Sequence, residues 1–403
     1  MTVTATGVGA RIPIASALDP VTLILKLVGD VCNINCYYCF EKRKGGQSDD
    51  FDRISIEEVR SALDLMGDRP VAVHLHGGEP LLYGRENMRL LLAELSARDT
   101  VTAIQIQTNG VLLDEAWLDL LESSTPAVEI GLSLDGDEQH NSYRVNFADR
   151  QTVGQVREAV DLLCRRSLPF GMISVIHDRN VDDPDALFDL VSDIPSLVSL
   201  NVVPCYDQGT APREVPSGNK GLLELIDASD GSVGDSWAVD PQAYVAFLRR
   251  FTERWISEGA YRRFNVEPIM SAVRRRRGRA PRMCHYSESK CGHIYTLYPG
   301  GRFGSCDELP AANSLLAHDV KKAAATTLDE TWATPLGRKQ LQVISAPLDE
   351  CATCSAQSLC GGGCMASRLR MRAVDRAEDY CGYRRAFVFW LDGIMHKLEA
   401  QDA

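Results

Sequence analysis

The sequence of 403 residues lacks the features that would assign it to several broad classes. It contains no run approaching the ~18 consecutive apolar residues of a membrane-spanning helix. Positive charge is in deficit, since 43 Lys and Arg stand against 55 Asp and Glu. The net charge of −12 indicates no attraction to nucleic acid or to an anionic membrane. Residues 1–10 also lack the basic and apolar segments of a signal peptide, so we expect a cytoplasmic protein.

Cysteine is abundant, but it is unevenly distributed. Of the 13 cysteines, three lie at positions 32–39 and eight lie between positions 284 and 381. A cytoplasmic chain keeps its thiols reduced, so two such clusters indicate metal or redox chemistry and not a disulfide framework. Cys164 and Cys205 stand alone. We expect both to be small apolar residues, although Cys205 follows a predicted strand and a role for its thiol stays open.

Predicted strands and helices alternate between residues 22 and 205. Parallel strands need crossover connections, so this alternation predicts an α/β fold with a parallel sheet and helices outside it. Chemistry in such folds gathers at the carboxyl ends of the strands. The predicted strands are 22–28, 71–75, 103–108, 128–134, 170–176 and 198–204, and the predicted helices between them are 55–66, 86–97, 114–122, 151–166 and 184–192.

The rest of the chain is less regular. Residues 207–240 are rich in Gly, Ser, Pro and Asp and predict a long loop or lid. A helix at 241–258 follows, and a last helix at 383–400 carries an apolar face that predicts core packing.

The first cysteine cluster has the spacing C-x3-C-x2-C, with ligand candidates Cys32, Cys36 and Cys39. Three thiolates on one loop can hold three irons of a [4Fe–4S] cluster and leave the fourth iron open. The alternatives are zinc and cysteines without a ligand. Structural zinc sites usually have four protein ligands, which disfavours zinc here.

This run resembles the signature of the radical S-adenosylmethionine (radical SAM) enzymes, including the aromatic Tyr38 before the last cysteine. Three further motifs of that family stand in order, each at the end of a predicted strand: His76-Gly77-Gly78-Glu79-Pro80, Gln107-Thr108-Asn109-Gly110 and Ser133-Leu134-Asp135-Gly136. A glycine after a strand is by itself more often a simple turn. Four matches in the family's order make the resemblance specific.

The resemblance implies a partial (β/α)6 TIM-like barrel and a definite chemistry. S-adenosylmethionine would chelate the open iron, and its cleavage would give a 5′-deoxyadenosyl radical that removes a hydrogen atom from substrate. Arg144 is the least specific of the implied contacts, since a solvated surface charge is its alternative. The cofactor-binding residues implied by the motifs are Tyr38, Gly77, Gly78, Glu79, Pro80, Asn109, Ser133, Asp135 and Arg144.

The second cysteine cluster resembles a SPASM domain, the C-terminal extension of many peptide-modifying radical SAM enzymes. Its spacing is C-x9-G-x4-C, a gap, C-x2-C-x5-C-x3-C, a gap and a final C. Eight thiolates can hold two auxiliary [4Fe–4S] clusters with four ligands each. Two four-thiolate zinc sites are the alternative. The resemblance implies one set of Cys284, Cys291, Cys306 and Cys364, and another of Cys351, Cys354, Cys360 and Cys381.

Asp307 directly follows Cys306. In anaerobic sulfatase-maturating enzymes, which share the SPASM domain, an Asp after the matching cysteine is the catalytic base. The resemblance therefore implies that Asp307 takes a proton from the substrate while an auxiliary cluster takes an electron. A capping or solvated Asp is the alternative, and the neighbouring Glu308 is a second candidate.

The stretch Arg263-Phe264-x-Val266, which leads to Arg282-Met283-Cys284, resembles peptide maturases that cross-link side chains, including cyclophane-forming enzymes. We therefore expect a ribosomally made precursor peptide as substrate, a flavodoxin or ferredoxin-type electron donor, and no nucleic-acid or membrane partner. Formylglycine formation on a sulfatase is the alternative, and a non-catalytic iron–sulfur carrier or zinc module is an alternative of another class. The expected divisions are a tail at 1–20, the barrel at 21–240, a bridge at 241–283, the SPASM domain at 284–382 and a helix at 383–403.

Two further groups of residues carry open interpretations. The basic run Arg274–Arg277 with Arg279 is either a solvated face or a docking site for an acidic leader or a flavodoxin. His74 and His76 share one face of a predicted strand, where they are either core histidines or contacts to cofactor or substrate.

Overall fold

A computed structural model describes residues 14–16, 19–39, 41, 53–205, 212–213, 224–225, 237–288, 290–309, 315–373 and 375–401. Its central feature is one sheet of ten strands in the order β12-β11-β10-β1-β2-β3-β4-β5-β6-β9. The strands are β1 (Val21–Lys26), β2 (Val71–His76), β3 (Val101–Thr108), β4 (Val128–Ser133), β5 (Phe170–Ile176), β6 (Leu197–Pro204), β9 (Asn265–Glu267), β10 (Ile294–Tyr298), β11 (Arg302–Gly304) and β12 (Leu315–Ala317).

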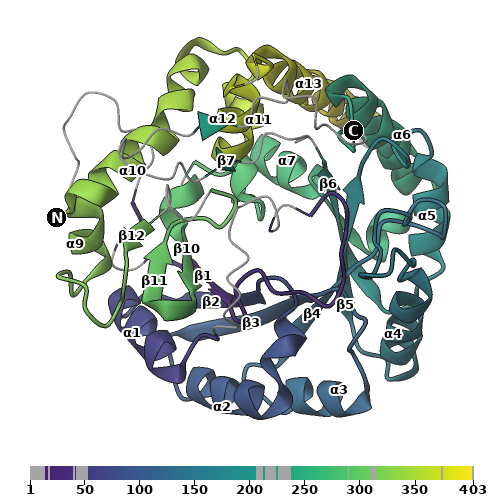
Figure 1. The fold of residues 1–403 in the computed structure, drawn as a ribbon. Helices are drawn as coiled ribbons and strands as arrows, with labels where there is room; N and C mark the ends of the chain where they lie inside the picture. The colour runs from purple at the N-terminus through teal and green to yellow at the C-terminus, as the bar shows by residue number, and fades with distance from the viewer. Residues whose placement is uncertain are drawn as a thin grey trace.

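Strands β1 to β6 are parallel and adjacent in chain order, as the alternating pattern predicts. Helices lie around the outside of the curved sheet (Figure 1). The crossover helices are α1 (Ile56–Met66), α2 (Arg85–Ser96), α3 (Glu115–Glu122), α4 (Val153–Arg165) and α5 (Pro184–Ser192). This is the α/β radical SAM type of fold expected from the sequence.

Local signals set the ends of these helices. Ser55 and Glu58 form the capping box that the sequence predicts before α1. The side chains of Asp114 and Asp183 accept backbone N–H groups at the starts of α3 and α5. Each helix then buries an apolar stripe against the sheet.

The period of two along the strands decides which residues reach the interior of the barrel. On β2, Val71, Val73 and Leu75 are buried, whereas His74 and His76 point the other way and are only half-buried. The inner face is less buried because it borders a cavity. The two histidines therefore share the interior face, as the sequence predicts.

The C-terminal half extends the same sheet, which the sequence did not predict. Strand β10 pairs in parallel with β1, and the antiparallel strands β11 and β12 follow it. At the other edge, β9 pairs with β6. The remaining helices are α6 (Pro241–Ser257), α7 (Ile269–Arg276), α9 (Leu328–Ala333), α10 (Pro335–Ser345), α11 (Gln357–Cys360), α12 (Met365–Ala373) and α13 (Ala377–Gln401).

Helix α13 begins at Ala377, six residues before the predicted start at 383, so Cys381 lies on it. It packs beside α6 at the top of the view in Figure 1. Most of the predicted loop at 207–240 lies outside the described residues, apart from 237–240 and the paired β7 (Pro212–Arg213) and β8 (Glu224–Leu225). Among the described helices, none is long and apolar enough to cross a membrane.

Candidate active site

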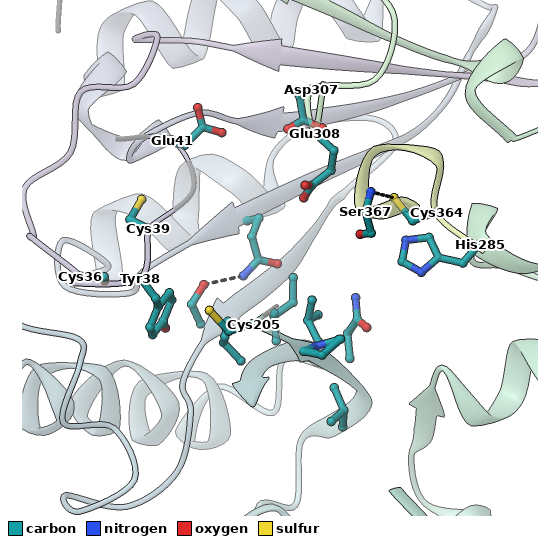
Figure 2. A pocket seen from close by; sticks show the side chains of 18 of the residues that line it. Cys36, Tyr38, Cys39, Glu41, Cys205, His285, Asp307, Glu308, Cys364 and Ser367 are labelled. Carbon is teal, nitrogen blue, oxygen red and sulfur yellow. Dashed lines mark hydrogen bonds between the residues drawn. The ribbon is translucent and has the colours of Figure 1, made fainter. Parts of the chain in front are cut away.

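A cavity of about 600 Å³ opens at the carboxyl ends of the strands. Figure 2 shows Cys36, Tyr38 and Cys39 on one side of it, and Cys364 and His285 on the other. Asp307 and Glu308 lie between these groups. The cavity therefore joins the first cysteine cluster to the second.

The first cysteine cluster lies on the loop after β1. The backbone N–H groups of Asn35 and Tyr37 donate to the carbonyls of Val145 and Tyr143, respectively. These two hydrogen bonds fix the loop against the segment after β4. Burial raises the pKa of the Cys32 thiol to about 12, and the nearby Cys36 and Cys39 add to this rise. The structure thus gathers the three sulfurs at the cavity wall.

The Gly77-Gly78-Glu79-Pro80 turn packs directly against this loop. A Cβ on Gly78 would lie 1.9 Å from the carbonyl oxygen of Val31, so only glycine fits there. The N–H groups of Gly78 and Glu79 donate to the carbonyls of Gly29 and Val31. This motif therefore positions the cysteine loop in addition to bordering the cavity.

The carboxylate of Glu79 is fully buried and ties two strand ends together. It accepts the Thr108 hydroxyl at 2.7 Å, the Asn109 N–H at 2.8 Å and the Leu81 N–H at 3.0 Å. Burial raises the pKa of Glu79, and these hydrogen bonds oppose that rise. Glu79 and Pro80 do not line the cavity in the described structure.

Tyr38, Asp135 and Arg144 form a buried network behind the cysteine loop. The Tyr38 hydroxyl donates to Asp135 at 2.5 Å and accepts from the Arg144 guanidinium at 3.1 Å. Arg144 is only 6% exposed, so the surface-charge alternative for it is wrong. Tyr38 and Arg144 line the cavity, whereas Asp135 lies behind them.

The remaining predicted cofactor contacts, Gly77, Gly78, Asn109 and Ser133, all line the cavity. The Asn109 amide donates to the Asn33 side chain at 2.7 Å and lies 3.6 Å from the Cys32 sulfur. The Ser133 hydroxyl accepts from the Gln107 amide at 2.9 Å. The ends of β3 and β4 thus present polar groups beside the first cysteine cluster.

Several of the eight C-terminal cysteines have charge neighbours from the set that the resemblance implies. Burial raises the pKa of the Cys306 thiol, and the nearby Asp307, Cys291, Cys284 and Cys364 add to this rise. Burial likewise raises the pKa of Cys381, and the nearby Cys351 and Cys360 add to it. Cys354 is half-buried and shares the neighbourhood of Cys381, since both raise the pKa of Arg385.

Asp307 takes part in a buried charge cluster that the sequence did not predict. Its Oδ2 lies 2.6 Å from the Nζ of Lys26, and that ammonium group also lies 2.5 Å from Glu41 Oε1. The Nδ1 of His76 lies 3.1 Å from the same Nζ. Lysine can only donate, so His76 accepts at Nδ1 and carries its proton on Nε2.

Lys26 has no exposed surface and lies at the centre of this cluster. The ligand atoms of Glu41, His76 and Asp307 lie within 4.8 Å of one another, which is the spacing of a metal site, but the ammonium group supplies the positive charge there. The neighbouring Glu308 also lines the cavity, where its carboxylate pairs with Arg370 at 3.0 Å. In the sequence, this charge cluster is indicated only by the position of Lys26 at the end of an apolar strand.

Other predicted residues have plainer surroundings. Cys205 is buried at the cavity wall beside Cys36, and Cys164 packs against the core from α4. In the basic run, Arg275 donates to the Tyr286 carbonyl, and Arg276 pairs with Asp392 and Glu399 of α13. These two arginines therefore hold the fold together, and the docking interpretation is wrong for them.

The donors present fit the implied cofactors. Three grouped thiols line one end of the cavity, and eight further thiols lie at or beyond its other end, which suits iron–sulfur clusters. The buried Nε–H of Arg144 has no hydrogen-bond partner in the described part of the chain, and Arg144 lines the cavity. An acceptor group of a bound cofactor would satisfy it.

Comparisons with known proteins agree with this site. The Radical SAM superfamily model matches residues 27–191. The chain is 27% identical to the serine-type anaerobic sulfatase-maturating enzyme of Klebsiella aerogenes over 376 residues, which is 91% of this chain and 84% of that enzyme. It is 24% identical over 258 residues to the cysteine-type enzyme of Clostridium perfringens, covering 60% of this chain and 62% of that one.

Two solved structures share the fold. Native anSMEcpe with bound AdoMet superposes with a TM-score of 0.71 at 20% identity, covering 94% of this chain and 99% of that one. Streptococcus suis SuiB bound to S-adenosylmethionine gives a TM-score of 0.56 at 16% identity, covering 87% and 74%.

The parallel α/β barrel and its cysteine-lined cavity define an enzyme whose chemistry depends on an iron–sulfur cofactor. Residues 27–191 carry a radical SAM domain, which indicates a radical SAM enzyme that uses S-adenosylmethionine and a [4Fe–4S] cluster. The alternative of a non-catalytic carrier or zinc module is therefore wrong.

Proposed function

We propose that the protein oxidises a side chain of a peptide and joins it to a second side chain, as in the maturation of a ribosomally made precursor. The observation that carries this proposal is the single cavity running from Cys32, Cys36 and Cys39 to Asp307 and Cys364. A substrate held between these ends would face a radical source on one side and groups for a proton and an electron on the other.

Each end has a defined task in this proposal. Cys32, Cys36 and Cys39 would hold a cluster that, with S-adenosylmethionine, would supply the radical that removes a hydrogen atom. Arg144, Asn109 and Ser133 orient the cofactor beside that loop. Asp307 accepts the proton that the oxidised side chain must lose, and Lys26 holds the Asp307 carboxylate toward the cavity at 2.6 Å.

The two C-terminal cysteine sets hold two auxiliary [4Fe–4S] clusters in this proposal, so the chain carries three clusters in all. The sets adjoin the substrate end of the cavity through Cys364. With four thiolates each, they leave no iron open to the substrate and suit electron transfer. A flavodoxin or ferredoxin-type partner would supply electrons to the cluster on Cys32, Cys36 and Cys39.

A peptide substrate is supported by relatives of both kinds. The structures of SuiB with the precursor peptide SuiA and of anSMEcpe with peptides have folds like this one. A second candidate product is formylglycine on a sulfatase, because the serine-type sulfatase-maturating enzyme is similar along 91% of this chain. Both products use the same cavity and the same removal of a hydrogen atom.

The test compares two substrates with the anaerobically reconstituted full-length enzyme. One is a synthetic peptide from the open reading frame beside the gene, and the other spans the modification site of a serine-type sulfatase. A cross-link and a serine-derived formylglycine each lose two hydrogen atoms, but only the aldehyde reacts with hydroxylamine. A product that does not react with hydroxylamine, and whose peptide bonds do not fragment between two residues in mass spectrometry, supports cross-linking. A hydroxylamine adduct supports formylglycine formation and overturns the cross-linking proposal.

The role of Asp307 needs its own pair of variants. Asp307→Asn should still form 5′-deoxyadenosine but give much less product, because the substrate proton has no acceptor. Glu308→Gln is the matched control, since Glu308 is bound to Arg370. Equal loss of product in both variants, or none in either, removes Asp307 from this role.

A further inference from the structure

Two buried arginines donate hydrogen bonds to cysteine sulfurs in the C-terminal half. The Nη1 of Arg368 lies 2.8 Å from the sulfur of Cys351, and the Nε of Arg384 lies 3.2 Å from the sulfur of Cys360. Arg368 is 5% exposed and Arg384 is 4% exposed. Both sulfurs belong to the set of Cys351, Cys354, Cys360 and Cys381, called the second set from here on.

Both guanidinium groups are held firmly in place. Arg384 also donates to the carbonyls of Cys360 and His285, and it lies 4.5 Å from the centre of the Tyr286 ring. Arg368 donates to the Gly362 carbonyl and pairs with Glu350 at 2.7 Å. Burying two cations beside thiols is costly unless the sulfurs carry negative charge, as cluster ligands do.

The set of Cys284, Cys291, Cys306 and Cys364, called the first set, has different neighbours. The Cys364 sulfur accepts a backbone N–H from Ser367 at 3.5 Å, and the Cys306 sulfur lies 3.9 Å from the carboxylate of Asp307. Lys290 lies near sulfurs of both sets and donates to the carbonyls of Gly363 and His285. Among the described residues, no arginine or lysine donates a hydrogen bond to a sulfur of the first set.

This difference has a direct electrostatic meaning. A cluster gains an electron more readily when nearby positive charge and N–H···S hydrogen bonds stabilise the added negative charge, and less readily beside carboxylates. The surroundings therefore favour reduction of the second set over reduction of the first set.

We propose that Arg368 and Arg384 raise the reduction potential of the cluster on the second set above that of the first set, and so direct electrons from the first to the second. This inference rests on the proposed function, in which both sets hold clusters. One electron would pass from the substrate radical to the cluster on the first set as Asp307 takes the proton, and would then pass to the cluster on the second set. A flavodoxin or ferredoxin-type protein would then take this electron from the second set, so that the oxidation of the substrate is balanced.

The chain places the two sets close enough for this step. Cys360 and Cys364 belong to different sets and are separated only by Gly361-Gly362-Gly363. Four residue steps span at most about 14 Å between their Cα atoms. Gly362 packs tightly here, because an added Cβ would lie 3.4 Å from the Cys351 sulfur.

The experiment is a redox titration of the reconstituted full-length chain, followed by electron paramagnetic resonance. In Arg368→Gln, one auxiliary signal should shift to a lower midpoint potential while the other two clusters keep theirs. Arg384→Gln should shift the same signal most and the other auxiliary signal less, because Arg384 also lies near Cys284 of the first set. Arg368→Lys and Arg384→Lys should recover part of the shift because they keep the charge. Arg372→Gln is the matched control, since Arg372 shares Glu350 with Arg368.

Unchanged potentials in both Gln variants, or an equal shift in the Arg372 control, would overturn the proposal. So would loss of about four irons in the Gln and Lys variants alike, because the arginines would then only hold the fold. Replacing Cys351, Cys354, Cys360 and Cys381 together with Ala separates this failure from that of the proposed function. If the iron content of this variant equals that of the wild type, the second set holds no cluster and the proposed cofactor count fails.

Discussion

The three cysteines at 32–39 and the eight between 284 and 381 offer the same ligand atom in different surroundings. The first three border a cavity beside Asn109 and Arg144. The others lie in two sets, one of which is closed in by buried guanidinium groups. Sulfur alone therefore does not define a site, because its neighbours decide whether a cluster meets substrate or only exchanges electrons.

The largest expected effect tests whether the two groups are independent. Replacing Cys32, Cys36 and Cys39 together with Ala should abolish 5′-deoxyadenosine formation, because no open iron remains. Of about twelve irons in the reconstituted chain, about eight should stay bound by the C-terminal sets. Chromatography of the nucleoside and iron analysis would check this, and surviving cleavage would contradict it.

A second prediction concerns Lys26, which joins the two halves through Glu41 and Asp307. Lys26→Met should lower the free energy of unfolding by about 3–5 kcal/mol, because two carboxylates stay buried without their cation. Urea denaturation measures this change. Lys322→Met is the control, because its ion pair with Asp319 lies at the surface and should contribute under ~1 kcal/mol. Equal stability of the two variants would contradict the central role of Lys26.

A third prediction concerns Gly78. Gly78→Ala should cost about 1–3 kcal/mol of stability, because its Cβ would overlap the Val31 carbonyl. Cleavage of S-adenosylmethionine should fall with it, since Val31 leads directly into Cys32. Gly154→Ala on α4 is the control, because no atom lies near its added Cβ. Normal cleavage in the folded Gly78 variant would show that the turn does not position the cysteine loop.

The smallest expected effect extends the comparison from sulfur to histidine. Burial lowers the pKa of His177, whose Nδ1 accepts from the Arg179 N–H while its Nε2 lies 3.1 Å from the His140 carbonyl. Burial likewise lowers the pKa of His285, beside the C-terminal cysteines, to about 3. Both histidines are therefore neutral in the folded protein at neutral pH.

The pH dependence of stability follows from this state. Below about pH 6.5 the unfolded chain takes up a proton at His177 that the folded chain does not. The free energy of unfolding therefore decreases as the pH is lowered, by at most about 1.4 kcal/mol per pH unit. His177→Gln should flatten this decline in urea denaturation, and the exposed His396→Gln should not. Identical slopes in both variants would argue against a neutral His177.

The sequence predicts the barrel well because its signals are local. The period of two in the strands and caps such as Ser55 depend on neighbouring residues only. Strands β9 to β12 are missed because they have three to five residues and pair with partners far along the chain. A short apolar run gives no sign of such a partner.

The candidate site divides in the same way. Cysteine spacing identifies the sulfur groups, because a cluster needs its ligands at set intervals. The sequence gives no sign that Lys26 meets Asp307, or that Arg368 and Arg384 meet sulfurs, because these contacts arise only from tertiary packing. Glu79 shows what a motif leaves out, since its carboxylate accepts two hydrogen bonds from residues at and just after the end of β3.

The pairing of β10 with β1 has a consequence for protein engineering. The paired residues run from Thr22 with Ile294 to Leu25 with Leu297. One edge of β1, the strand that leads into the cysteine loop, is therefore hydrogen-bonded to a strand of the C-terminal half. Cutting the chain before residue 284 would expose that edge and leave Lys26 without Asp307. A chimera that exchanges the C-terminal half must therefore also carry a β1 whose edge and buried lysine match the new β10 and Asp.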